Sequence, residues 1–141
     1  MTTDFIEHPF TIRLHDTDAA GLLFFGHLFR HAHDAFESFM TAIGLPIDHL
    51  IRAGQTLLPL AHAEADYRRP LRHGDAVRVR VRVADIRRRS FAIEYRFMNS
   101  LGEVAATART VHVQVSADMT PTEDLAEPLR AALSAYRTRG D

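Results

Sequence analysis

The sequence contains no cysteine, no lysine and no tryptophan. Without cysteine, the chain cannot form a disulfide, a thiolate nucleophile, a cysteine-ligated zinc site or an iron–sulfur cluster. Without lysine, Schiff-base chemistry on a lysine is excluded. All 17 basic residues are arginines, which recognise phosphate groups through paired hydrogen bonds.

Long apolar runs and a strong excess of one charge are also missing. No stretch approaches the ~20 apolar residues that span a bilayer. The acidic start MTTDFIEHPF lacks the cationic and apolar segments of a signal peptide. The net charge of −1 provides no general attraction to nucleic acid or to membranes. We therefore expect a cytoplasmic protein with neither kind of partner.

The length of 141 residues predicts a single domain, 1–141, with one hydrophobic core. Between residues 26 and 43 the apolar side chains recur with a period near 3.6, and Gly44 and Pro46 follow as stop signals, which predicts a long helix. A short helix is predicted over residues 46–53, and a terminal amphipathic helix over residues 121–138.

The other segments alternate between apolar and polar residues, as half-buried strands do. These segments are a short strand through Phe10, Ile12 and Leu14, and residues 57–69, 76–87, 90–98 and 104–116, the last ending on Val111, Val113 and Val115. Because four of them follow one another closely, we expect an antiparallel meander with one apolar face.

The apolar stripe of the 26–43 helix and the apolar face of the sheet should pack together, since each buried Phe or Leu contributes about 1.5–3 kcal/mol. This favours an α+β fold in which an antiparallel sheet curls around one long helix. The open edges of such a sheet favour a homo-oligomer.

Two aspartates, Asp16 and Asp18, precede the long helix in the loop DTDAAG. Aspartates in loops commonly stabilise turns. Four apolar residues follow at 22–25, however, and burial at the mouth of an apolar pocket raises the pKa and nucleophilicity of a carboxylate. The helix start adds free N–H groups that suit an oxyanion. Together these groups could hydrolyse a thioester without a metal, since a thiolate leaves without a strong general acid.

The histidines offer weaker signals. His27 and His31 are four residues apart on the helix, as are His33 and Glu37, and such pairs can bind zinc. The H-E-x-x-H pattern and a third ligand pair are absent, so we favour a polar lining of a cleft or subunit contact. His33 or Glu37 could orient water or substrate there. His62 is either an interior histidine or a site residue.

Arg87, Arg88 and Arg89 stand together at a turn between two strands. Three guanidinium groups there could hold a phosphate or diphosphate, or they could form a hydrophilic hairpin tip. The chain has no P-loop, GxGxxG or GxSxG pattern, so nucleotide hydrolysis, dinucleotide binding and serine-hydrolase chemistry have no support.

The segments HDTDAAGLLFFGHLFRHAHDAFESF (15–39) and LLPLAHAEADYRRPLRHGDAVRVRV (57–81) resemble the hot-dog-fold acyl-CoA thioesterases of the 4-hydroxybenzoyl-CoA thioesterase type. Within that group the chain is most similar to the 1,4-dihydroxy-2-naphthoyl-CoA hydrolases of phylloquinone and menaquinone synthesis. The resemblance extends to about Ser116. It implies a sheet wrapped around a central helix, active sites between the subunits of a dimer or tetramer, an acyl-CoA substrate and no cofactor.

The same resemblance assigns the catalytic carboxylate to Asp18, as nucleophile or general base, and the oxyanion site to the backbone N–H of Phe25 or Gly26. Related hydrolases of Tol-Pal gene clusters have a histidine where this chain has Phe25, a difference that favours aromatic acyl groups. His33 and Glu37 match an H-[DE]-A-[FY]-E pattern of the naphthoyl subgroup.

We expect His27 and His62 to line the substrate pocket as well. Arg87, Arg88 and Arg89 fall in the region where relatives contact the phosphates of CoA.

The prediction is therefore metal-independent hydrolysis of an aromatic acyl-CoA, with 1,4-dihydroxy-2-naphthoyl-CoA as the first candidate. Alternative substrates are 4-hydroxybenzoyl-CoA, benzoyl-CoA or another acyl-CoA. A hot-dog dehydratase or hydratase is a second alternative, although its H-F-P and D-x-N-P-x-H strings are absent. A non-catalytic module that binds acyl-CoA or acyl-carrier protein is the third.

Overall fold

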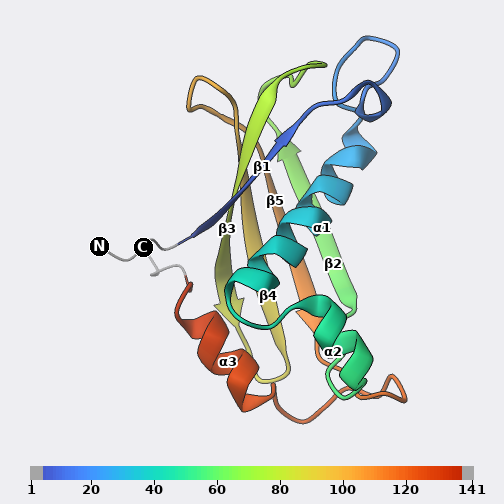
Figure 1. The fold of residues 1–141 in the computed structure, drawn as a ribbon, viewed down its shortest axis with the longest axis vertical. Coiled ribbons are helices and arrows are strands. Elements are labelled where there is room, and N and C mark those ends of the chain that lie inside the picture. Colours follow the sequence, from blue (N-terminus) through green and yellow to red (C-terminus); the bar gives the residue numbers. More distant parts are fainter. Residues whose placement is uncertain (1–4, 138–141) are drawn as a thin grey trace.

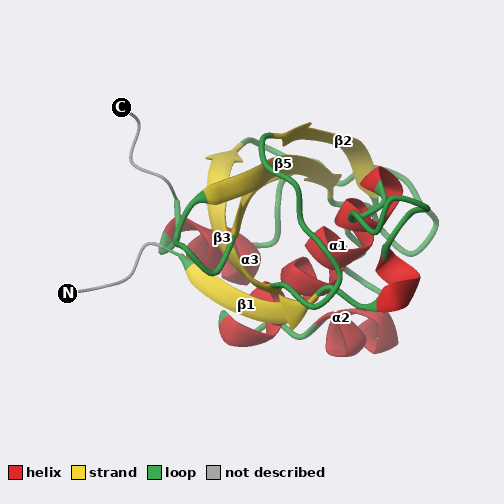
Figure 2. Cartoon of the chain, turned by 90° about the horizontal axis from the view of Figure 1, so that it is seen from above, coloured by secondary structure: helices red, strands yellow, loops and turns green. Residues whose placement is uncertain are grey.

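The computed structural model describes residues 5–137. Its five strands form one antiparallel sheet in the order β1-β3-β4-β5-β2, and the sheet curves around helix α1 (Phe25–Ala42) (Figures 1 and 2). The strands are β1 (Ile6–Thr11), β2 (Leu60–Tyr67), β3 (Ala76–Ile86), β4 (Ser90–Met98) and β5 (Val104–Val113). The expected α+β fold, with a sheet wrapped around one long helix, is confirmed.

The core lies between α1 and the concave face of the sheet, as the two periodicities predict. The buried residues of α1 include Leu28, Ala32, Phe36, Phe39 and Met40. Opposite them, the alternate valines of β3 at 77, 79, 81 and 83 are at most 1% exposed. The intervening arginines of β3 lie on the convex face, because successive side chains of a strand point to opposite sides.

The position of β2 corrects the expected meander. Strands β3, β4 and β5 are consecutive neighbours, but β2 pairs with β5 at the far edge of the sheet, and β3 pairs with β1 instead. The connection after β2 cannot close a hairpin onto β3 because it bonds to other segments. The N–H groups of Arg68 and Arg69 donate to Ala105 on β5, and the Leu71 carbonyl accepts from Leu23.

The first strand ends earlier than its alternating pattern suggests. The strand β1 ends at Thr11, and a short 3-10 turn, η1 (Leu14–Asp16), follows. The chain turns there because the Asp16 carboxylate accepts a 2.8 Å hydrogen bond from the N–H of Arg13. As a result Leu14, which was expected to be half-buried in a strand, is 75% exposed.

The two short helices lie at the end of the molecule away from the start of α1 (Figure 1). Helix α2 (Ile47–Ala53) ends at Gly54, whose φ of +70° suits glycine. Helix α3 (Glu127–Ser134) starts later than the predicted residue 121, because Pro128 fits only the first turn of a helix. Residue 138, the predicted end of this helix, lies outside the described residues. Within residues 5–137, no helix is long and apolar enough to cross a membrane.

The second half of β5 has the opposite polarity to the one expected. Thr110 and His112 face the core and are 7% and 5% exposed, whereas Val111 and Val113 are only half-buried. Polar side chains in a core need hydrogen-bond partners, so their presence there points to a polar feature under the helix.

Candidate active site

The loop between η1 and α1 folds back on itself. The N–H of Asp18 donates to the carbonyl of Leu22 (2.8 Å), and Thr17 forms an isolated bridge with Leu23. Gly21 closes the turn with a φ of +77°, a conformation that favours glycine. The loop is thereby held beside the start of α1, at one end of the molecule (Figure 1).

Asp18 uses one of its two carboxylate oxygens to hold this turn. Its Oδ1 accepts hydrogen bonds from the N–H groups of Ala20 (2.8 Å) and Leu22 (3.2 Å). Among the described residues, its Oδ2 has no hydrogen-bond partner. The turn role and a chemical role are therefore compatible, because the second oxygen is free to react.

The expected burial of Asp18 is not provided by a single copy of the chain. Asp18 is exposed, and the apolar residues beyond it only begin to enter the core, with Phe24 40% and Phe25 65% exposed. The chain turns at Gly21 before these residues reach α1, so their side chains do not enclose the carboxylate.

The first turn of α1 presents free backbone donors. The N–H of Phe24 is bound to the carbonyl of Asp16 (2.8 Å), and that of His27 to the carbonyl of Phe24 (2.9 Å). The N–H groups of Phe25 and Gly26 have no acceptor among residues 5–137, as is usual at a helix start. These two groups can bind an oxyanion.

Tyr67, at the end of β2, holds the start of α1 in place, a role that no sequence pattern indicated. Its hydroxyl donates a 2.6 Å hydrogen bond to the carbonyl of Phe25. Burial raises the pKa of Tyr67, so the hydroxyl remains a donor. The contact joins two segments 42 residues apart, which is why periodicity could not reveal it.

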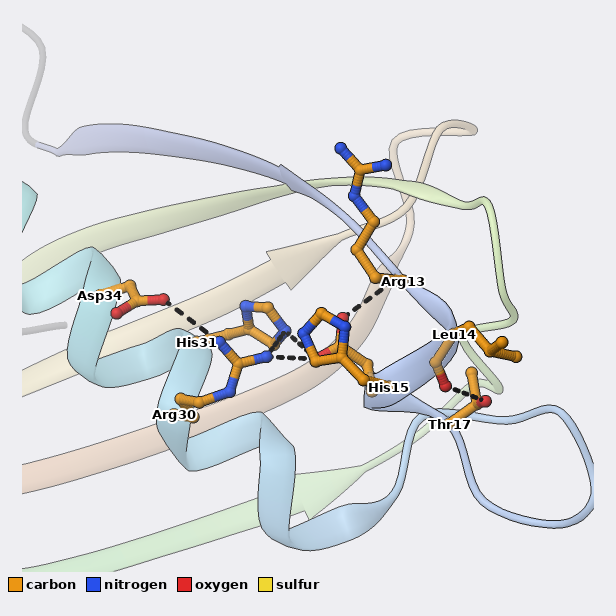
Figure 3. Close-up of polar contacts among 8 residues, drawn as sticks. Arg13, Leu14, His15, Thr17, Arg30, His31 and Asp34 are labelled. Carbon is orange, nitrogen blue, oxygen red and sulfur yellow. Dashed lines mark hydrogen bonds and ion pairs between the residues drawn. The ribbon is translucent and has the colours of Figure 1, made fainter.

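Asp16 is the buried aspartate of the pair, with 0% exposure. Figure 3 shows two of its partners, Arg30 and His31, which project from α1 towards the loop that follows Arg13. The Oδ2 of Asp16 accepts from the N–H of Arg13, and its Oδ1 accepts from the guanidinium of Arg30 and from Nε2 of His31 at 2.9 Å. Burial alone raises the pKa of Asp16, but the hydrogen bonds from Arg13 and His31 and the charge of Arg30 lower it below its ordinary value. The carboxylate is therefore ionised.

His31 is a neutral partner in this cluster rather than a metal ligand. Burial and the charge of Arg30 lower the pKa of His31, and together they outweigh the hydrogen bond and the charge of Asp16, which raise it. Its ring stacks on Phe10, with centroids 3.8 Å apart. Because Arg30 and His31 belong to α1, the cluster ties the loop that carries Asp18 to the helix that carries the free N–H groups.

The other predicted site residues, His27, His33, Glu37 and His62, lie in three different places. His33 and Glu37 are exposed on α1 and together line a cavity of about 210 Å³ beside α2. His27 is half-buried against the ring of Phe24. His62 lies on the β2 edge with its side chain 58% exposed, so the interior alternative for this histidine is wrong.

A larger cavity of about 500 Å³ lies between α1 and the sheet. Its lining includes Phe29, His33, Phe36, Tyr95, Thr110 and His112. The alternation of residues 104–116 did not predict a role for His112, because it placed the neighbouring valines on the buried face instead of Thr110 and His112.

In the folded molecule, Arg87, Arg88 and Arg89 lie at the opposite end of β3 from the loop that carries Asp18. The N–H of Ile12 bonds to Asp75 beside the start of β3, and the 11 residues of β3 then extend about 33 Å to the turn with Arg87, Arg88 and Arg89. Arg87 is paired with Asp85 (3.0 Å). Arg88 is paired with Asp124 (3.2 Å). These arginines therefore do not share a site with Asp18 of the same copy.

Among residues 5–137, no three histidine or acidic side chains are arranged to hold a metal ion. The order of the strands, the central helix and the loop at its start define a hot-dog fold of the thioesterase class.

The model of the thioesterase-like superfamily matches residues 12–133, and the chain belongs to this family. Two relatives are named 1,4-dihydroxy-2-naphthoyl-CoA hydrolase. The one from Synechococcus elongatus is 33% identical over 120 residues, covering 84% of this chain and 88% of its own. The one from Rippkaea orientalis is 32% identical over 121 residues, with the same coverage.

Solved structures agree with this assignment. A 1,4-dihydroxy-2-naphthoyl-CoA thioesterase from Synechocystis superposes with a TM-score of 0.84 and 26% identity, covering 92% of this chain and 96% of its own. A gentisyl-coenzyme A thioesterase superposes with a TM-score of 0.81 and 26% identity, covering 92% and 99%.

Proposed function

We propose that the protein is a thioesterase that hydrolyses an aromatic acyl-CoA, with 1,4-dihydroxy-2-naphthoyl-CoA as the first candidate substrate. The observation that carries the proposal is the free Oδ2 of Asp18 in a loop that leads directly to the free N–H groups of Phe25 and Gly26. The names of the relatives in Synechococcus and Rippkaea support the choice of substrate.

The geometry suggests a short reaction scheme. The N–H groups of Phe25 and Gly26 hydrogen-bond to the thioester carbonyl and stabilise the negative charge that develops on its oxygen. The free oxygen of Asp18 either attacks the carbonyl carbon or removes a proton from an attacking water. The C–S bond then breaks and CoA leaves as a thiolate. In the first case water hydrolyses the resulting anhydride, and both routes yield the free acid and CoA.

The proposal includes a homo-oligomer, either a dimer or a tetramer. Strand β2 is an open edge of the sheet, and Phe25, Leu60 and Tyr67 are between 49% and 65% exposed. A second copy packed against these residues would bury them and enclose Asp18. Arg87, Arg88 and Arg89 would then bind the phosphates of a CoA whose thioester lies at Asp18 of another copy.

The acyl group is proposed to be aromatic and hydroxylated. The gentisyl-CoA thioesterase and the naphthoyl-CoA enzymes both act, by their names, on CoA thioesters of hydroxylated aromatic acids. 4-Hydroxybenzoyl-CoA, benzoyl-CoA and other acyl-CoA substrates remain the alternatives for this site. The scheme uses no metal or cofactor, and a cytoplasmic location follows from the acyl-CoA substrate.

Thiol release from a panel of aryl-CoA substrates, followed with a chromogenic disulfide reagent, tests this function. The assay has no background from the protein, because the chain has no cysteine. We expect release from 1,4-dihydroxy-2-naphthoyl-CoA that EDTA does not inhibit. Binding without release would instead support the acyl-CoA-binding module, and hydration of an enoyl-CoA without thiol release would support a hydratase.

A further inference from the structure

The cavity between α1 and the sheet lies along the face of the helix that also carries Phe25. Phe29 and His33 line the cavity and follow Phe25 by four and eight residues, which is about 6 and 12 Å along the helix axis. An aromatic acyl group held with its carbonyl at Phe25 therefore extends into this cavity. Beneath it are the buried polar residues of β4 and β5, Tyr95, Thr110 and His112.

These three side chains form a hydrogen-bond chain with only one consistent direction. The carbonyl of Leu58 can only accept, so Nδ1 of His112 donates to it at 3.2 Å. Burial, together with the nearby His33, lowers the pKa of His112 to about 4, so the ring is neutral and Nε2 is an acceptor. The hydroxyl of Thr110 donates to that Nε2 at 3.0 Å, and the hydroxyl of Tyr95 donates to Oγ1 of Thr110 at 2.8 Å.

The direction of this hydrogen-bond chain determines what the wall formed by Tyr95 and Thr110 can recognise, while Arg30 and His33 on α1 also line the cavity. Every proton of Tyr95, Thr110 and His112 is already committed to a partner, so only oxygen lone pairs of Tyr95 and Thr110 remain. Phe29 and Phe36 supply an apolar surface around them. The ring of Phe36 is stacked on His112 with centroids 4.2 Å apart and planes 5° apart. A flat ring that carries a hydrogen-bond donor complements this surface.

We propose that Tyr95 and Thr110 form a specificity site that selects aromatic acyl groups carrying a ring hydroxyl, which donates its proton to their oxygens. This inference rests on the proposed thioesterase function and deepens it, because it names the feature of the acyl group that the enzyme selects.

The test compares two substrates that differ only in the donor. In 4-hydroxy-2-naphthoyl-CoA and 4-methyl-2-naphthoyl-CoA the substituents are similar in size, but only the hydroxyl has a proton to donate. The wild-type enzyme should favour the hydroxyl substrate by about tenfold in kcat/KM, mainly through KM, as one hydrogen bond would give.

Three variants separate recognition from folding. The double variant Tyr95→Phe/Thr110→Val replaces both oxygens by apolar groups of similar shape and should reduce the ratio to one or below, while the methyl substrate is still hydrolysed. Thr110→Ser keeps the hydroxyl and should keep the preference. Thr107→Val makes the same chemical change on the other face of β5 and should leave the ratio as in the wild type.

Two results would overturn the proposal. Equal kcat/KM values for the two substrates in the wild type, or an unchanged preference in the double variant, would exclude the specificity site and leave the thioesterase function intact. Failure of the wild type to release thiol from either naphthoyl substrate or from the benzoyl and hydroxybenzoyl thioesters would remove the proposed function and, with it, this inference.

Discussion

The hydroxyl of Tyr67 donates a 2.6 Å hydrogen bond to the backbone carbonyl of Phe25, the first residue of α1. That carbonyl belongs to the same peptide group as the N–H of Gly26, one of the two free donors at the helix start. A hydrogen bond accepted by the oxygen of an amide polarises the amide group and makes its N–H a stronger donor. Tyr67 therefore both orients and strengthens the proposed oxyanion site.

Replacing Tyr67 by Phe should lower kcat by about tenfold with little change in KM, because the lost hydrogen bond acts on the transition state. Steady-state thiol release measures both constants. Tyr136→Phe is the matched control, since this tyrosine packs edge-on against Phe39 and its backbone bonds to β3. An unchanged kcat in Tyr67→Phe would contradict the positioning role.

Asp18→Asn should lower kcat by about 10²–10⁴-fold, which is the usual contribution of a general base. The fold should be retained, because the amide oxygen of asparagine can still accept from Ala20 and Leu22. Asp48→Asn, an exposed change on α2, serves as the control. Thiol release and urea unfolding measured on the same samples separate the two effects, and a fully active variant would remove Asp18 from the mechanism.

Asp16→Ala should destabilise the protein by about 2–3 kcal/mol, because it leaves Arg30 and His31 without their shared acceptor. The value is at the low end for a buried pair because Arg30 is 44% exposed. Asp34→Ala removes the more exposed carboxylate beside Arg30 and should cost less than about 1 kcal/mol. Urea unfolding at pH 7 compares them, and equal stability of the two variants would show that the buried cluster does not hold the loop.

The buried His112 should make stability depend on pH. Its pKa is about 4 in the folded chain and ~6.5 when unfolded, so the unfolded state binds the proton first as the pH falls. This stabilisation is complete above pH ~7 and should fall by about 2 kcal/mol by pH 5.

Urea unfolding at pH 7.5 and pH 5 of the wild type and of His112→Gln measures this term. The variant should lose less stability over the same interval. His62→Gln removes an exposed histidine and should behave as the wild type does. Identical pH dependence in the wild type and His112→Gln would show that folding does not lower the pKa of His112.

Mixing two inactive variants tests whether the arginines act between copies. The chain separates Asp18 from Arg87, Arg88 and Arg89 by the length of β3, so each proposed site combines groups from two copies. Asp18→Asn and the triple change of these arginines to Ala should each have low activity. Co-refolding them should recover up to about a quarter of the wild-type rate, because mixed oligomers contain some sites with both sets intact. No recovery would show that Asp18 and the arginines do not combine across copies, and full activity of the triple variant alone would place the arginines outside the site.

Much of the fold could be predicted because periodicity reports burial. The stripe of α1 and the alternate valines of β3 face each other as their spacing requires. The place of β2 could not be predicted in this way, because its pairing with β5 depends on where residues 68–71 find partners. A hydrophobic pattern identifies a strand but does not identify its neighbour.

The candidate site was predictable to a smaller extent. The DTDAAG loop and the helix after it are local features, so their composition indicated both the turn and the free N–H groups. Tyr67 and His112 act through contacts with Phe25 and Leu58, which are 42 and 54 residues away in the sequence. Such contacts exist only in the folded chain. The same holds for the different burial of Asp16 and Asp18, which are only two residues apart.

The turn at position 18 needs only one oxygen that accepts hydrogen bonds, and asparagine supplies that oxygen as well as aspartate does. A single-nucleotide change in the codon would therefore preserve the backbone path while it removes the reactive atom. On this fold, one substitution can therefore convert an enzyme into a non-catalytic protein that binds the same thioester, or reverse that change, without an unstable variant in between. Descendants of this chain that carry asparagine there are expected to bind thioesters and release them unchanged.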